Sequence, residues 1–139
     1  MMHYKPYPEY KDSGVDYLGK IPKEWKALKF KYLLSESLKY GANESAESDS
    51  REYPRYIRIT DLTDQGKLRE DTFKSLLWDK AESYMLSDGD ILLARSGATV
   101  GKSFIDRKTD GPACYTGYLI KASCDTRKAN PEYVYLTAP

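Results

Sequence analysis

The stretch from Ser87 to Phe104 constrains the fold most, because it places polar groups directly after an apolar run. Ser87-Asp88-Gly89 is typical of a turn, since Asp side chains bond to nearby backbone and Gly accepts a positive φ. The apolar run from Ile91 to Ala94 then predicts a buried strand. Arg95 and Ser96 are the first polar residues after it. The sequence therefore predicts a cation and hydroxyls at the rim of a core.

The segment that follows this strand has two interpretations. Gly97 and Gly101 bracket three residues ahead of Lys102, which suits either a hairpin with a polar loop or a ligand-binding loop. A phosphate-binding loop requires four residues between its glycines and a helix after its lysine. Here three residues separate the glycines, and an extended pattern follows Lys102. The sequence therefore argues against nucleotide binding and leaves the other two interpretations open.

The composition describes one soluble globular domain. Because 139 residues are enough for a single hydrophobic core, residues 1–139 are expected to form one domain, with residues 1–25 as an extended N-terminal arm. A formal net charge of +1 excludes a protein coated in basic residues but allows a basic face. The 13 tyrosines supply rings with polar tips, which suit a core and a contact surface alike.

Histidine and cysteine usage bears on catalysis and location. His3 is the only histidine in the sequence, so Ser/His/Asp and Cys/His arrangements are ruled out. Cys114 and Cys124 lack metal-ligand spacing, so we expect no metal, no cofactor and a reducing, cytoplasmic location. No apolar run approaches the ~20 residues of a membrane span. The sequence therefore predicts a non-enzymatic protein without membrane contact.

A second informative segment runs from Arg55 to Asp61. Its residues alternate, with Ile57 and Ile59 on one side, which predicts a half-buried strand. The other, solvent-exposed side carries an aromatic ring, a guanidinium and a hydroxyl, from Tyr56, Arg58 and Thr60. A third strand is expected over Ala113–Lys121, with Tyr115 on one of its faces.

Helical spacing occurs at three places. Apolar residues recur at i, i+3, i+4 and i+8 over residues 30–38, where Gly41 is expected to end the helix, and at helical spacing again over residues 77–84. Asn130-Pro131-Glu132 predicts a helix start, with Asn as the N-cap and Pro at the first helical position. Residues 42–50 contain no large apolar side chain and are expected to form an exposed, mobile loop.

With these pieces placed, the chain resembles the N-terminal target recognition domain of the specificity (S) subunit of type I restriction-modification enzymes. Four segments carry the resemblance, in this order: Tyr10–Gly19 with Ile21–Trp25, Tyr56–Leu62, Gly89–Gly101, and Asn130–Tyr135. Together they extend nearly from end to end of the chain.

The resemblance implies an α+β domain with a small mixed or antiparallel sheet, a barrel-like core and a few short helices. It implies binding of double-stranded DNA at one half of a bipartite target, to which methyltransferase and restriction subunits are directed in phage defence. Those partner subunits would hold the methylation and cleavage activities. Residues 130–139 would begin a truncated spacer helix, and the second recognition domain of the family is missing. A homodimer of half-subunits is a further partner that the resemblance allows.

The residues expected to contact DNA follow from the chemistry of its backbone and bases. Phosphates attract cations and hydroxyls, and base edges are read by arginine forks, amides and hydroxyls. The expected DNA-binding residues lie on the segments described above: Tyr56, Arg58, Thr60, Asp61, Arg95, Ser96, Thr99, Lys102 and Tyr115. For each arginine, the alternative is a surface ion pair with one of the 21 carboxylates.

Two other functions stay open at this point. The tyrosines and the N-terminal arm suit a protein-interaction module that does not bind DNA, and the truncation suits a non-functional half-subunit. Ionic strength separates the first of these from a DNA-binding domain. Several phosphate contacts weaken steeply with added salt, whereas an aromatic protein interface does not.

Overall fold

The computed structural model describes residues 7–16, 18–24, 29–94 and 102–137. The chain divides into two compact units, Met1–Tyr32 and Leu33–Pro139. In the first unit, β1 (Tyr10–Asp12) and β2 (Lys20–Pro22) pair antiparallel. The expected extended arm thus doubles back as a hairpin, because the turn residues between the strands include Gly14 and Gly19, both with positive φ.

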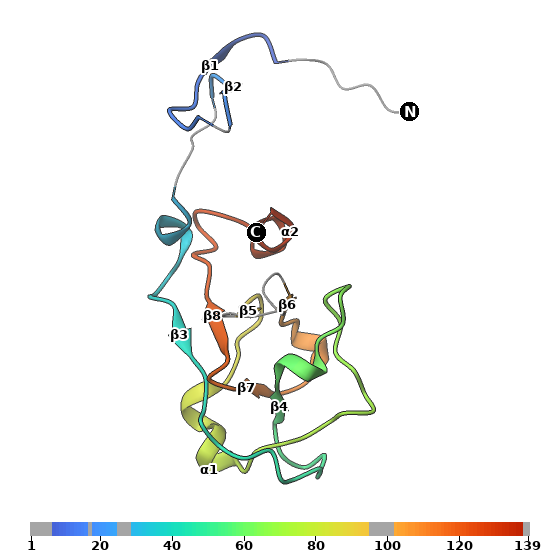
Figure 1. Cartoon of the computed structure of the whole chain (residues 1–139). Coiled ribbons are helices and arrows are strands. Elements are labelled where there is room, and N and C mark those ends of the chain that lie inside the picture. Colours follow the sequence, from blue (N-terminus) through green and yellow to red (C-terminus); the bar gives the residue numbers. More distant parts are fainter. Residues whose placement is uncertain (1–6, 17, 25–28, 95–101, 138–139) are drawn as a thin grey trace. The chain divides into compact units, whose positions relative to one another are not determined.

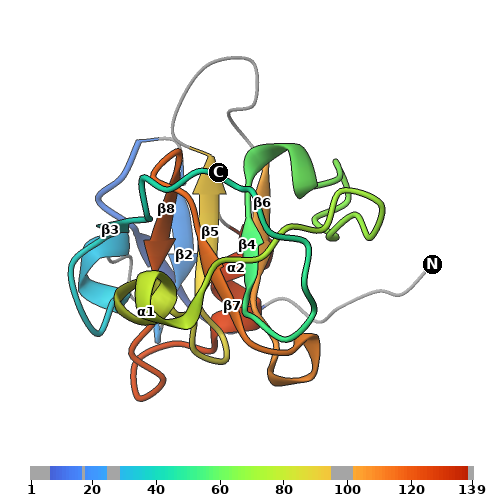
Figure 2. The same ribbon diagram turned by 90° about the horizontal axis from the view of Figure 1, so that it is seen from below.

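The main sheet of the second unit contains four antiparallel strands in the order β3-β8-β5-β6 (Figure 1). These strands are β3 (Lys39–Tyr40), β8 (Leu119–Ala122), β5 (Ile91–Ala94) and β6 (Ser103–Ile105). Strand β5 lies between β8 and β6, and the first two residues of its apolar run are fully buried. Figure 2 shows β5 and β8 side by side. The predicted strand is confirmed, and β6 pairs with it antiparallel. The glycine-bracketed segment between them, residues 97–101, lies outside the described residues.

A second sheet consists of β4 (Arg55–Ile57) and β7 (Ala113–Tyr115), which pair in parallel with Ile57 opposite Tyr115. Both strands are buried along their whole length. The larger core cluster joins this pair to the main sheet: Ile57, Leu62, Leu92, Phe104, Ala113, Tyr115 and Leu119. The core therefore packs β4, β7 and the loop after β4 against β5, β6 and β8.

The helices are short. They are η1 (Phe30–Leu33), η2 (Ile59–Asp61), α1 (Trp78–Ala81), η3 (Glu82–Tyr84), η5 (Lys108–Asp110) and α2 (Pro131–Thr137), the η elements being 3-10 turns. The predicted helical stretch over residues 77–84 is confirmed, as is the N-cap of α2, where Asn130 Oδ1 accepts the Glu132 amide at 2.9 Å. The chain is therefore of the α+β class, with small sheets and few, short helices.

Two predicted strands end earlier than expected. The strand from Arg55 to Asp61 stops at Ile57, because the Asp61 carboxylate accepts the backbone amide of Arg58 at 2.8 Å and turns the chain into η2. The predicted alternation is wrong there, and Tyr56 faces the core with 1% of its surface exposed. The stretch from Ala113 to Lys121 divides into β7 and β8 at a turn.

The segment around Gly41 also differs from the sequence prediction. Residues 30–38 form only the 3-10 turn η1 before β3 begins, so Gly41 ends no helix. A Cβ atom at Gly41 would lie 2.2 Å from the Tyr115 carbonyl oxygen, which shows that glycine is needed for close backbone approach to β7. The loop over residues 42–50 is not wholly exposed, because Ala42 is buried and Ser48 pairs with Ser75.

Candidate nucleic-acid interface

The Arg58 side chain lies at the start of η2 and donates three hydrogen bonds to two residues. Its Nε and Nη2 atoms donate to the two carboxylate oxygens of Asp61 at 3.2 and 3.1 Å, and Nη2 also donates to the Thr72 carbonyl at 2.6 Å. The side chain is 27% exposed. Within the described residues, Nη1 of Arg58 makes no hydrogen bond. The arginine fork is therefore fixed in direction and keeps donors for an external acceptor.

Asp61 is fully buried and connects this segment to its neighbours. Besides Arg58, it accepts the hydroxyl of Thr72, and Arg55 Nη2 lies 3.7 Å from its Oδ1. Such a carboxylate has its lone pairs taken inside the protein, so its role is to orient the two arginines. Direct contact of Asp61 with DNA, as the sequence predicted, is incompatible with this burial.

Thr60 lies on η2, two residues after Arg58, and Lys102 contacts the chain at the end of the same turn. Thr60 is exposed in the middle of η2. Lys102 extends its Nζ to the Leu62 carbonyl oxygen, 3.4 Å away, and thereby joins the start of β6 to the end of η2. Three of the predicted DNA-binding residues, Arg58, Thr60 and Lys102, therefore lie on or contact the segment of residues 58–62. Arg95, Ser96 and Thr99 lie outside the described residues.

The two predicted tyrosines are structural. The Tyr56 hydroxyl is within hydrogen-bond distance of the Ala42 and Glu44 carbonyls, at 3.0 and 2.9 Å, and Tyr115 is likewise 1% exposed. Burial raises the pKa of both hydroxyls, to about 12 for Tyr115. The prediction that Tyr56 lies on a solvent-exposed face is wrong, because the parallel pairing of β4 and β7 places both rings in the core.

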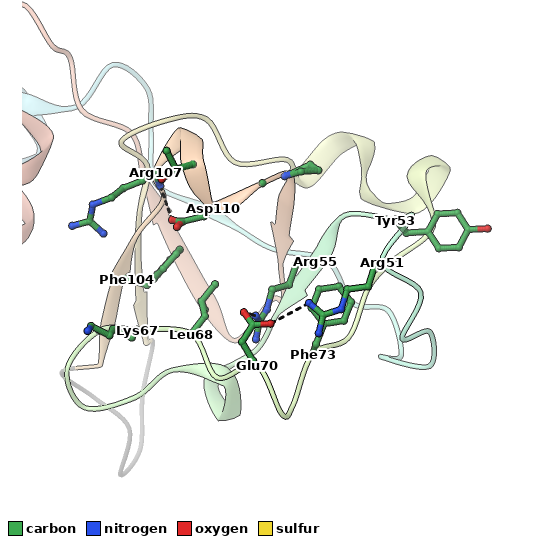
Figure 3. Close-up of a pocket in the computed structure, with 14 residues that line it drawn as sticks. Arg51, Tyr53, Arg55, Lys67, Leu68, Glu70, Phe73, Phe104, Arg107 and Asp110 are labelled. Atoms are coloured by element: carbon green, nitrogen blue, oxygen red, sulfur yellow. Dashed lines mark hydrogen bonds and ion pairs between the residues drawn. The ribbon is translucent and has the colours of Figure 1, made fainter.

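A groove of about 630 Å³, which sequence reasoning missed, opens next to the hydrogen-bonded residues Arg58, Asp61 and Thr72, here called the Arg58 cluster (Figure 3). Arg69 lies between the lining residues Leu68 and Glu70, and its amide donates to the Asp61 carbonyl at 2.8 Å. The groove and the Arg58 cluster are therefore adjacent. Four cationic side chains and two carboxylates line it: Arg51, Arg55, Lys67, Arg107, Glu70 and Asp110. The sequence signal that could have indicated it is Arg51-Glu52-Tyr53-Pro54-Arg55, where two arginines flank an aromatic ring.

The arginines of the groove differ in how they are held. Arg51 stacks on the Phe73 ring, 3.9 Å from the centroid, and Arg55 lies 5.3 Å from the same centroid. Arg107 instead pairs with Glu132 at 3.0 Å, and in Figure 3 its guanidinium points away from Phe73. Phe73 and the two arginines beside it are therefore the fixed cationic end of the groove.

Among residues 7–16, 18–24, 29–94 and 102–137, no group of three or more His, Cys, Asp or Glu side chains is arranged to hold a metal ion. In the same part of the chain, every helix is too short or too polar to cross a membrane.

Comparison with known proteins adds no assignment: no protein-family model matches the chain, and no curated protein matches its sequence.

Proposed function

We propose that this chain is a sequence-specific DNA-binding domain that recognises one half of a bipartite target, as target recognition domains of type I specificity subunits do. In this proposal it acts in the cytoplasm without catalytic groups of its own. It directs the methylation and cleavage subunits of a restriction-modification enzyme to DNA. The four sequence segments that resemble this family are the first support, and the α+β class is compatible with it.

One observation of geometry carries the proposal: the fork of Arg58 is preorganised, and the exposed Thr60 hydroxyl and the Lys102 ammonium belong to or contact the same segment of residues 58–62. Asp61 and Thr72 fix the direction of the guanidinium, so little side-chain entropy is lost when its remaining donors meet a base edge. Thr60 supplies a hydroxyl, and Lys102 a point charge for a phosphate.

The test is a titration of the chain with a cognate duplex, selected from a random library, and a scrambled duplex at two salt concentrations. Lys102→Ala is expected to weaken binding to both duplexes alike and to lower the salt slope by about one unit. Arg58→Lys keeps the charge but not the planar fork. It is expected to cost roughly 1–3 kcal/mol on the cognate duplex and much less on the scrambled one.

The matched control is Lys80→Ala. Lys80 is a half-exposed lysine on α1 that pairs with Glu44 at 3.7 Å and belongs neither to the Arg58 cluster nor to the groove. Its removal is expected to leave duplex binding within a factor of two. Equal binding of cognate and scrambled duplexes by the parent chain would contradict the proposal.

Exposed aromatic side chains favour a second candidate function, a protein-interaction module. Tyr40 on β3 is 58% exposed, and Tyr118 in the turn before β8 is 72% exposed. Tyrosine is enriched at protein interfaces. Binding that survives high salt and is lost in Tyr118→Ala would support this second function over the first.

A further inference from the structure

The fixed cationic end of the groove contains two guanidiniums that converge on one carboxylate. Glu70 Oε2 lies 3.1 Å from Arg51 Nη1, and Glu70 Oε1 lies 3.4 Å from Arg55 Nη1. In Figure 3 a dashed line joins Glu70 to Arg51, and Phe73 lies beside Arg51. A carboxylate of this same chain thus marks the position in which an anion meets both guanidiniums.

Access and burial differ sharply across these ion pairs. The Arg55 side chain is 8% exposed, whereas the Glu70 side chain that touches it is 74% exposed. The buried guanidinium is therefore reached from the solvent side of the groove. Because Glu70 is so exposed, its pairing is weak and can be exchanged for another anion at little cost.

Arg55 also has unused hydrogen-bonding capacity. Its Nη2 donates to the Arg69 carbonyl, but its buried Nε has no partner within the described residues. A buried guanidinium donor without an acceptor is unfavourable. A phosphate group carries more acceptor oxygens than a carboxylate and can bridge two guanidiniums.

The remaining charges of the groove also favour an anion. Lys67 lines it, and within the described residues its ammonium has no ion pair. Asp110 is engaged by the backbone amide of Arg107 at 3.0 Å. Exchange of Glu70 for an external anion would leave Arg51, Arg55 and Lys67 available to it.

We propose that the Arg51, Arg55 and Phe73 end of the groove is a phosphate-binding site, and that Glu70 occupies it as an internal competitor until a phosphate displaces it. The phosphate comes either from a DNA backbone, in which case the inference rests on the proposed function, or from a free phosphate compound. The aromatic ring holds the Arg51 guanidinium flat, so the fork is oriented before the phosphate arrives.

The experiment compares Glu70→Gln with Asp71→Asn. Glu70 and Asp71 are adjacent and both exposed, so each variant removes one negative charge from the same part of the surface. Only Glu70→Gln removes the carboxylate that pairs with the two arginines. Each is titrated with inorganic pyrophosphate and, separately, with a scrambled duplex at low salt. Glu70→Gln is expected to bind both probes about 2- to 5-fold more tightly than the parent, the size of an exposed ion pair. Asp71→Asn is expected to change binding less than half as much.

A double variant tests whether the gain acts through the arginine. Adding Arg51→Ala to Glu70→Gln is expected to abolish the gain for both probes. Equal effects of Glu70→Gln and Asp71→Asn, or a gain that survives Arg51→Ala, would overturn the proposal. If pyrophosphate binding shows the expected pattern while no variant binds duplex, the phosphate site stands and the DNA-binding function falls. If the chain binds duplex specifically but Glu70→Gln leaves duplex binding unchanged, the DNA-binding function stands and the phosphate site falls.

Discussion

The guanidinium of Arg58 and the carboxylate of Asp61 form a two-point ion pair in which the carboxylate is fully buried and the guanidinium is partly exposed. This relationship gives Arg58 two roles, because the edge that faces Asp61 stabilises the fold while Nη1 is left for an external acceptor. A mutation of Arg58 therefore affects stability and binding together.

Arg58→Ala is expected to lower the free energy of unfolding by about 2 kcal/mol, because it removes donors from a buried carboxylate. Urea denaturation followed by circular dichroism measures this loss. Arg127→Ala is the matched control, since its guanidinium pairs with Asp125 at 3.2 Å but is 88% exposed. The control is expected to leave the free energy of unfolding close to that of the parent, because exposed ion pairs contribute little. Similar losses in both variants would mean that the buried Arg58–Asp61 pair stabilises the fold no more than an exposed ion pair does.

Gly41→Ala is expected to destabilise the second unit by roughly 1–3 kcal/mol, because its Cβ would overlap the carbonyl oxygens of Tyr115 and Thr116 at 2.2 and 2.3 Å. Thermal unfolding measures the effect. Gly111→Ala serves as a comparison, since its φ of +82° strains an alanine but nothing lies within 4 Å of its Cβ position. A smaller loss of stability in Gly41→Ala than in Gly111→Ala would contradict this expectation. It would mean that the backbone at Gly41 moves away from the Tyr115 and Thr116 carbonyls at little energetic cost.

Local signals predicted part of this fold well. The turn at Ser87 to Gly89, strand β5 and the start of α2 depend on residues close in sequence, and all three are confirmed. The predicted exposure of the interface residues was wrong where a segment distant in sequence packs against them. The parallel pairing of β4 with β7 buried Tyr56 and Tyr115, although each lies in a segment with polar residues.

The groove was missed for the same reason. Arg51, Glu70 and Arg107 come from three separate segments, and only the folded chain places them around one hollow. Asp61 was predicted to end a strand and to contact DNA, but it is fully buried. Its burial depends on donors from Arg58 and Thr72, which no local pattern indicates.

Asn130→Ala is expected to destabilise the chain by about 1 kcal/mol, because the side-chain oxygen of Asn130 caps the first turn of α2 at the Glu132 amide. Asn130→Asp retains an acceptor and places a negative charge at the helix N-terminus, so it is expected to match the parent or exceed it. Urea unfolding of the two variants provides the measurement. A loss of equal size in both would mean that the cap does not stabilise the helix.

Asp106 is a buried carboxyl beside the turn that begins β5. Its Oδ1 has no hydrogen-bond partner within the described residues. Burial, with the nearby carboxylates of Asp110, Asp90 and Asp88, raises its pKa from 3.8 to about 7. Of these neighbours, Asp90 is itself engaged by Ser123 at 2.7 Å and lies 4.0 Å from Lys121 Nζ.

Asp106→Asn is expected to stabilise the chain at pH 8 and to have little effect near pH 4. The folded state binds the Asp106 proton more tightly than the unfolded state, so the stability present below pH 4 is lost progressively as the pH rises to about 7. An amide removes this loss because it cannot ionise. Urea midpoints at pH 4, 6 and 8 give the measurement, with Asp71→Asn as a control for the loss of an exposed carboxylate. Parallel pH profiles for the parent and Asp106→Asn would mean that Asp106 ionises normally in the folded chain.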